Sequence, residues 1–334
     1  MKKITEYFRS AKLNIKFTII IVLFTVVPLC ISIGALFHIM IQNVIDENIS
    51  YIQYTMERNR DNMATRTDSL NMSTQFFLSD DSLKQVLNAS VSGEELSTED
   101  WLKFKNMEVS SLERLVNNNP LLYSVRVYAV NDQVQEMMPI LYSRKRMEKQ
   151  SWAEKEDYTG WNYNYTDNIF SSYTMDQNRK IMSLITPVED RNNGTIGVIE
   201  AAMTMENMFP SLYESIEDEW SCFYTDSGEK YFGENRKPES EKLIEVIKPG
   251  HLEDGEIMTG YKESGRKKLV VSGMHIREMS GTLICVKDIT SDINRVRWNR
   301  LLFIIGMAVL TIFLALVINL IVQHLLGKFY DILK

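Results

Sequence analysis

Residues 151–173 hold the densest group of side chains that could recognise a ligand. The segment carries seven aromatic residues in 23 positions, whereas aromatic residues make up 10% of the whole chain. Aromatic rings offer flat apolar faces, and Tyr and Trp add a hydrogen-bonding group, so such a cluster suits the gripping of a small ligand. The alternative is that the rings fill a domain core because of their large area. The seven are Trp152, Tyr158, Trp161, Tyr163, Tyr165, Phe170 and Tyr173.

No catalytic pattern accompanies these rings. The chain contains no G-x-S-x-G, no phosphate-binding loop, no H-E-x-x-H and no G-x-G-x-x-G. It has four histidines and three cysteines, and none of them stands at a zinc-ligand spacing. The sequence therefore predicts no catalytic residue, no metal site and no cofactor, and it leaves open whether the chain belongs to an enzyme.

Two long apolar segments indicate a membrane protein. Residues 17–41 and 301–326 contain no Asp, Glu, Lys or Arg. About 20 apolar residues suffice to cross a hydrocarbon core of about 30 Å. The first segment is too long for a signal peptide, whose apolar core spans about 7–15 residues. We therefore predict transmembrane helices at 17–41 and 298–326, with the lipid bilayer as a partner.

The charges around these segments predict the topology. Residues 1–16 form a basic tail of net charge +4, which favours a cytoplasmic N-terminus. Two spans then return residues 327–334 to the cytoplasm as the start of a linker, and residues 42–297 lie outside the cell. Three arginines just before the second span oppose this assignment, but the first helix usually dominates. They are Arg295, Arg297 and Arg300.

The exterior segment is acidic. The net charge of the chain is −7, residues 1–16 carry +4 and residues 298–334 carry +2, which leaves −13 for residues 42–297. This charge argues against nucleic acid as a partner. Cys222 and Cys285 lie in this segment, where a disulfide could persist, or they are two buried thiols on neighbouring strands.

A long helix is predicted at residues 43–79. No Pro or Gly interrupts residues 36–92, so this helix and the first span are expected to form one rod. Apolar residues recur every seven positions, which indicates either a coiled-coil seam in a homodimer or an amphipathic helix that packs on its own domain. These residues are Ile49, Met56, Met63, Leu70 and Phe77.

The remaining pattern predicts an α+β chain with two sheet units. Pro120 ends a helical stretch at 80–118, and Asn193-Gly194 marks a hairpin turn. A membrane-distal unit is expected at 80–215 and a membrane-proximal unit at 216–290. Further helical segments are predicted at 144–156 and 207–215, and strands at 121–130, 180–188, 195–205, 220–225, 229–232, 268–275 and 282–288.

Several stretches together resemble the double Cache sensor of bacterial receptors. They are the span ending in VVPLCISIGALF, the long helix, Ser151-Trp152 followed by Gly160-Trp161, and IMSLITPVEDRNNGTIGVIEAAMTMENMF. Phe223–Glu229 resembles the opening of the membrane-proximal half, and the N-terminal part is most similar to YesM-like sensor histidine kinases. The resemblance implies two PAS-like antiparallel-sheet units between two spans. It also implies a HAMP linker and a histidine kinase core, of which this sequence, ending at Lys334, holds only the first helical residues.

The resemblance also suggests where a ligand would bind. Some double Cache domains bind amino acids through an Arg-x-Trp-Tyr motif and a later Asp. Aligning on Trp152 puts Gln150, Ala153 and Ala202 at the Arg, Tyr and Asp positions, so an amino acid is not expected, and a carbohydrate that stacks on the aromatic rings is the alternative. Glu200, on the same strand face as Ala202, could substitute for the Asp. The candidate ligand-binding residues are Tyr128, Tyr142, Trp152, Trp161, Tyr163, Tyr165, Asp167, Tyr173 and Glu200.

The predicted function is that of a transmembrane signal sensor. The chain is expected to be the extracellular input module of a two-component sensor histidine kinase in the cell membrane. Its partners would be a small extracellular ligand, with carbohydrate as one candidate, or a ligand-loaded binding protein, and a second copy of the chain. The alternatives are the sensor half of a chemoreceptor or nucleotide cyclase, and a stand-alone surface binding protein without catalytic output.

Overall fold

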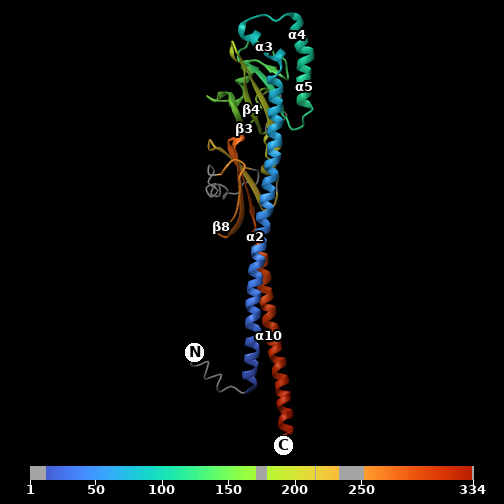
Figure 1. Ribbon diagram of the computed structural model, residues 1–334, viewed down its shortest axis with the longest axis vertical. Coiled ribbons are helices and arrows are strands. Elements are labelled where there is room, and N and C mark those ends of the chain that lie inside the picture. Colours follow the sequence, from blue (N-terminus) through green and yellow to red (C-terminus); the bar gives the residue numbers. More distant parts are fainter. Residues whose placement is uncertain (1–12, 171–178, 215, 233–251, 333–334) are drawn as a thin grey trace. The chain divides into compact units, whose positions relative to one another are not determined.

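The computed structural model describes residues 13–170, 179–214, 216–232 and 252–332 (Figure 1). Its helices are α2 (Leu13–Leu78), α3 (Asp81–Ser92), α4 (Thr98–Lys103), the π-helical turn η1 (Phe104–Glu108), α5 (Val109–Asn117), α6 (Arg144–Met147), the 3-10 turn η2 (Ser151–Glu154), α7 (Met205–Met208), α8 (Pro210–Tyr213), the 3-10 turn η3 (Arg277–Met279) and α10 (Thr290–Ile332). Its strands are β1 (Ser124–Ala129), β2 (Leu141–Tyr142), β3 (Gly160–Tyr165), β4 (Ile181–Asp190), β5 (Gly194–Thr204), β6 (Glu219–Thr225), β7 (Lys230–Phe232), β8 (Ile257–Ser264), β9 (Lys267–Ile276) and β10 (Gly281–Asp288). The predicted α+β fold class, a long helix followed by two sheets and a second apolar helix, is confirmed.

The first sheet is built around the predicted hairpin. Its strand order is β2-β1-β5-β4-β3, with β1 and β2 parallel and the other described pairs antiparallel. Gly194 opens β5 with φ of +68°, a backbone conformation that suits glycine, directly after the Asn193 of the predicted turn. Strand β1 pairs with β5 so that Arg126 stands opposite Glu200. This register brings a basic and an acidic side chain to the same place in the sheet.

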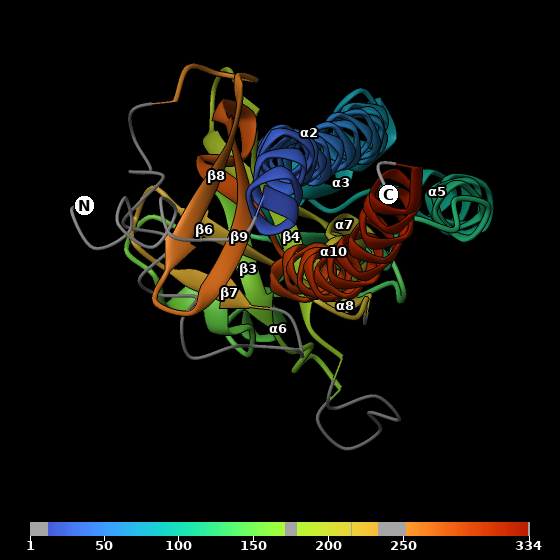
Figure 2. The same ribbon diagram turned by 90° about the horizontal axis from the view of Figure 1, so that it is seen from below.

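The second sheet has the order β7-β6-β10-β9-β8. Figure 2 shows β8 and β9 as a long orange hairpin. Four strands of this sheet agree with the prediction. The fifth, β8, is predicted as a loop because its segment is rich in charge and glycine. In the first sheet, β3 is likewise a strand that the sequence does not predict within the aromatic segment. Both are edge strands of mixed polarity, and such strands are stabilised by pairing with a neighbour rather than by a pattern of their own.

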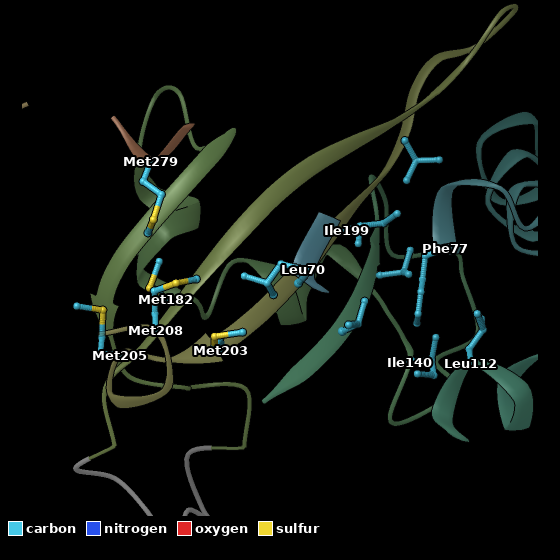
Figure 3. Packing of buried hydrophobic residues seen from close by; sticks show 14 of the residues in the cluster. Leu70, Phe77, Leu112, Ile140, Met182, Ile199, Met203, Met205, Met208 and Met279 are labelled. Carbon is cyan, nitrogen blue, oxygen red and sulfur yellow. The ribbon is translucent and has the colours of Figure 1, made fainter. Parts of the chain in front are cut away.

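The chain divides into two compact units, one of residues 52–259 and 272–286 and one of residues 1–51, 260–271 and 287–334. The larger unit holds a core in which the side chains of α2 pack with those of both sheets. Figure 3 shows a group of methionines at one end of this core and Phe77, Leu112 and Ile140 at the other. The heptad residues Met56, Met63, Leu70 and Phe77 are all buried here. The interpretation as an amphipathic helix that packs on its own domain is therefore confirmed for these four positions.

The smaller unit contains the apolar ends of α2 and α10. Phe37 and Phe303 meet edge to face at 6.2 Å, so the two helices contact one another. Most of their other apolar side chains are exposed, among them Phe24 at 75%. By length and composition both helices could cross a membrane.

Gly281, the first residue of β10, leads to a first prediction about the core. A Cβ atom added there would lie 2.5 Å from the Phe223 ring and 2.8 Å from the Tyr224 carbonyl oxygen. Gly281→Ala should therefore lower the free energy of unfolding by about 1–3 kcal/mol through overpacking. Gly260→Ala, where the added Cβ meets only open space, is the control and should be neutral or slightly stabilising. Thermal unfolding of the full chain in detergent micelles compares the two, and equal melting temperatures would contradict this packing.

Candidate functional site

Three charged side chains are buried together on the first sheet. Arg126 on β1 binds Asp167 through two hydrogen bonds, Nη2–Oδ2 at 2.6 Å and Nη1–Oδ1 at 3.1 Å. Its Nη1 also lies 3.6 Å from Oε2 of Glu200 on β5. The side chains of Arg126, Asp167 and Glu200 are 8%, 12% and 0% exposed. Gln150 donates from Nε2 to Oδ1 of Asp167 at 2.9 Å. Such buried charges are costly unless they are paired, and here each one is.

Glu200 is the point at which three elements meet. Its Oε2 accepts a 2.6 Å hydrogen bond from the Tyr128 hydroxyl on β1. Its Oε1 accepts from the Tyr165 hydroxyl on β3 at 2.6 Å and from Nε1 of Trp152 on η2 at 2.9 Å. Oγ of Ser183 on β4 lies 2.7 Å from the Tyr165 hydroxyl oxygen. Glu200 thus ties β1, β3 and η2 to β5, and a change at its carboxyl group would alter a hydrogen bond to each of these three elements.

Aromatic rings surround the charges. Tyr128 lies 5.8 Å from the ring of Tyr142 and 5.8 Å from that of Trp152, in tilted and edge-to-face contacts. Trp152 contacts Tyr158 at 5.7 Å, and Tyr142 contacts Phe170 at 6.2 Å. Rings at these separations attract one another beyond the effect of area burial. The arrangement combines apolar faces with fixed polar groups, a combination found both in domain cores and in sites for small molecules.

The burial of the cluster shifts its ionisation. Burial, reinforced by the nearby Glu200, raises the pKa of both Tyr128 and Tyr165 well above the ordinary value. Burial alone would raise the pKa of Asp167, but the hydrogen bonds and charge of Arg126 and a hydrogen bond from Gln150 outweigh it and lower that pKa. At neutral pH the tyrosines are therefore neutral donors and Asp167 is an acceptor. Perturbed groups of this kind gather at functional sites more often than elsewhere.

The structure brings together six of the nine candidate residues: Tyr128, Tyr142, Trp152, Tyr165, Asp167 and Glu200. Trp161 and Tyr163 lie apart from them, because both donate hydrogen bonds to backbone carbonyls of η3 at the second sheet. Tyr173 lies outside the described residues.

Sequence reasoning missed Arg126 and Gln150. The signal for Arg126 was present, since a lone charge between Val125 and Val127 in a strand that is otherwise largely apolar needs a buried partner. The sequence presents Gln150 only as a replacement for an arginine, whereas its side chain is fully buried and donates a hydrogen bond to Asp167.

The cysteines of the larger unit are free thiols. Cys222 and Cys285 are both buried and form no disulfide. Burial raises their pKa values to about 12 and about 11, respectively. Of the two alternatives, the structure shows buried thiols. Among the described residues no group of His, Cys, Asp and Glu is arranged to hold a metal ion.

Asp167 gives a prediction about pH. Its pKa is lower in the folded chain than the unfolded value of about 3.9, so its stabilisation is present above about pH 4 and is lost as the pH falls through the folded pKa. Asp167→Asn should therefore be less stable than the wild type by about 1–3 kcal/mol at pH 7, with a gap that closes below about pH 4. Urea unfolding across this pH range measures the gap. Asp61→Asn, at a side chain that is 74% exposed, is the control, and a gap for Asp167→Asn that stays constant with pH would contradict the assignment.

No protein-family model and no curated protein matches this chain. Solved structures to which it is similar include the extracellular domain of the putative histidine kinase vpHK1S-Z8, at 12% identity over 74% of this chain and 91% of that chain with a TM-score of 0.42. The periplasmic sensory domain of the Campylobacter jejuni chemoreceptor Tlp1 matches at 8% identity over 74% of this chain and 95% of that chain, with a TM-score of 0.42. The ligand-binding domain of the Pseudomonas aeruginosa PAO1 amino acid chemoreceptor PctB, in complex with L-Arg, matches at 10% identity over 73% of this chain and 96% of that chain, with a TM-score of 0.38. The chain is thus similar, at low identity, to sensory and ligand-binding domains of both histidine kinases and chemoreceptors.

Proposed function

We propose that this chain is the sensory input of a bacterial transmembrane receptor of the double Cache kind, and that its first sheet binds a small polar ligand. The observation that carries this proposal is the buried cluster of Arg126, Asp167 and Glu200 enclosed by aromatic rings. Buried ion clusters often stabilise a domain less than an apolar core of the same volume would. A cluster of this kind therefore needs another reason to be present, and ligand recognition is the simplest one.

The two apolar helices support a membrane-anchored sensor. The exposed apolar side chains of α2 and α10 need a nonaqueous environment, which a bilayer around residues 17–41 and 298–326 would supply. With the basic tail in the cytoplasm, residues 42–297 lie outside the cell and both termini lie inside. The proposed location is therefore the cell membrane, with the charged and aromatic cluster on the extracellular side.

Ligand binding would act by exchange of the existing ion pairs. An anionic or hydroxyl group that takes the Arg126 guanidinium would release Asp167, while a donor group of the ligand would compete with the tyrosine hydroxyls for Glu200. The cluster then has two arrangements, one closed on itself and one closed on the ligand. A ligand that favours the second shifts the population toward it.

Two ligand classes fit the cluster for different reasons. The aromatic rings, carboxylates and Gln150 amide suit a sugar, which stacks its faces and donates hydroxyl hydrogens. The second candidate is an amino acid, and one observation favours it. The Arg-x-Trp-Tyr motif of amino-acid-binding domains has its arginine at the position of Gln150, and here Arg126 on β1 supplies a guanidinium to the same cluster. Arg126 beside two carboxylates complements a zwitterion.

The experiment is a thermal-unfolding screen of the full chain in detergent micelles against sugars and amino acids. A ligand at 100 times its Kd stabilises by about 2.7 kcal/mol, so a clear rise in melting temperature is expected for one class. The rise should vanish in Glu200→Gln and persist in Arg60→Met, a change at a side chain that is 46% exposed. A rise that survives Glu200→Gln would place the ligand elsewhere, and no rise with either class would refute both candidates.

For the output we propose a histidine kinase, on the strength of the YesM-like resemblance. A chemoreceptor or cyclase is the alternative, and a surface protein without output is the third. The coding sequence after Lys334 distinguishes them, because a histidine kinase core, a long coiled coil and a stop codon are different outcomes.

A further inference from the structure

Strand β3 touches the candidate site with one residue and the second sheet with two others. Tyr165 donates its hydroxyl hydrogen to Glu200. Two positions earlier, the Tyr163 hydroxyl donates to the carbonyl oxygen of Met279. Nε1 of Trp161 donates to the carbonyl oxygen of Glu278 at 2.6 Å. All of these residues belong to the larger compact unit.

A backbone irregularity makes this double contact possible. In a regular strand Tyr163 and Tyr165 would point to the same face, because side chains alternate with a period of two. The pairing of β3 with β4 shifts register between Asn162 and Tyr165, and Asn164 between them has φ of +54°. Such a bulge redirects the side chains that follow it, and Asn tolerates this conformation better than most residues. Tyr165 can therefore enter the cluster while Tyr163 points to the second sheet.

The side chain of Tyr163 packs against residues of the second sheet. The Tyr163 ring lies 5.4 Å from Phe223 on β6 and 5.8 Å from Tyr231 on β7. The carbonyls that Trp161 and Tyr163 hold belong to η3, which leads directly into β10, the strand beside β6. A movement of β3 would thus be transferred to the central strands of the second sheet.

We propose that β3 is the element through which a change at Glu200 reaches the second sheet, with Trp161 and Tyr163 as positioning residues for η3. This inference rests on the proposed sensory function and describes how a change at the same site would be transmitted to the second sheet. When a ligand competes for Glu200, the Tyr165 hydroxyl bond weakens and the bulged end of β3 is freed. The two hydrogen bonds to η3 then lose their fixed donors.

Hydrogen exchange of the full chain in lipid nanodiscs tests this without any ligand. Tyr165→Phe and Tyr128→Phe are a matched pair for Glu200, because each removes one hydroxyl bond of 2.6 Å to Glu200 from a buried ring. Tyr165→Phe also removes the 2.7 Å contact with Oγ of Ser183 on β4. Only Tyr165 lies on β3. Tyr165→Phe should speed amide exchange in residues 277–283 about fivefold or more, and Tyr128→Phe should change it less than about twofold. Equal effects of the two variants, or none, would overturn the proposal.

A reverse arm keeps the test decisive if Tyr165→Phe unfolds the sheet. Coupling is reciprocal, so Tyr163→Phe should speed exchange of the Ala153 and Lys155 amides beside Trp152. Tyr231→Phe, which alters a ring against Tyr163 but leaves β3 intact, is its control. An unchanged exchange rate of the Ala153 and Lys155 amides in Tyr163→Phe would contradict the proposed coupling.

The two proposals fail separately. If no sugar or amino acid raises the melting temperature but Tyr165→Phe and Tyr128→Phe differ in exchange, the ligand proposal fails and the β3 connection stands. If a ligand binds and the two variants exchange alike, only the connection fails.

Discussion

Replacing Arg126 with methionine is expected to lower the free energy of unfolding by about 3–5 kcal/mol. The side chain keeps much of its volume, but Asp167 and Glu200 lose a buried counter-charge at 2.6 and 3.6 Å. Removing one partner of a buried ion pair is costly because the other charge stays out of water without compensation. Urea unfolding of the full chain, followed through the fluorescence of its tryptophans, measures the loss.

Two controls separate charge from packing in this experiment. Arg60→Met removes an exposed arginine and should change the free energy of unfolding by less than about 0.5 kcal/mol. The triple variant Arg126→Met, Asp167→Asn and Glu200→Gln removes all three charges together and should recover most of the loss. If Arg126→Met alone costs under about 1 kcal/mol, or if the triple variant is no better, the cluster is not held by the ion pairs described.

Replacing Met56 with aspartate should have a still larger effect, of about 5 kcal/mol or more. Met56 is fully buried in the core between α2 and the sheets. The change forfeits about 2–5 kcal/mol of packing and also buries a carboxylate that has no partner. Because a domain is stable by only about 5–15 kcal/mol, the larger unit should unfold or come close to unfolding at room temperature.

This result discriminates between the two interpretations of the heptad pattern. A coiled-coil seam predicts that Met56→Asp lowers the association of two chains and leaves each one folded. The buried position predicts loss of near-UV circular dichroism and of folded structure in every chain. Tyr54→Asp, at a side chain that is 66% exposed, is the control on the same helix and should leave the fold intact. A folded but monomeric Met56→Asp would restore the coiled-coil interpretation.

Local patterns predicted much of the fold. The hairpin of β4 and β5 follows from two β-rich runs around Asn193-Gly194, and the part of α2 after Gly34 follows from a long stretch without Pro or Gly. The aromatic density near Trp152 also marked a segment whose rings pack together with Tyr128 and Tyr142. Each of these signals depends on residues that are neighbours in the sequence, so tertiary contacts only had to agree with them.

The candidate site was predicted in part, for a physical reason. Its tyrosines and carboxylates could be proposed from residue type, but the partner of a buried charge depends on strand register. Arg126 meets Glu200 only because β1 pairs with β5 in one register, and Asp167 reaches it from beyond the end of β3. A shift of one residue would turn these side chains to the other face.

The sequence by itself determined that this protein has two long apolar helices around an acidic α+β segment with an aromatic cluster, because hydropathy, charge and periodicity are properties of short stretches. The tertiary structure decided which aromatic residues share the site. The bulge at Asn164 turns Tyr165 to Glu200, whereas Trp161 and Tyr163, which precede it, contact the second sheet, although all three lie within five residues of one another. The tertiary structure also decided that the heptad face of α2 is turned into its own core. A periodic pattern shows that a face must be covered, and only the packed fold shows what covers it.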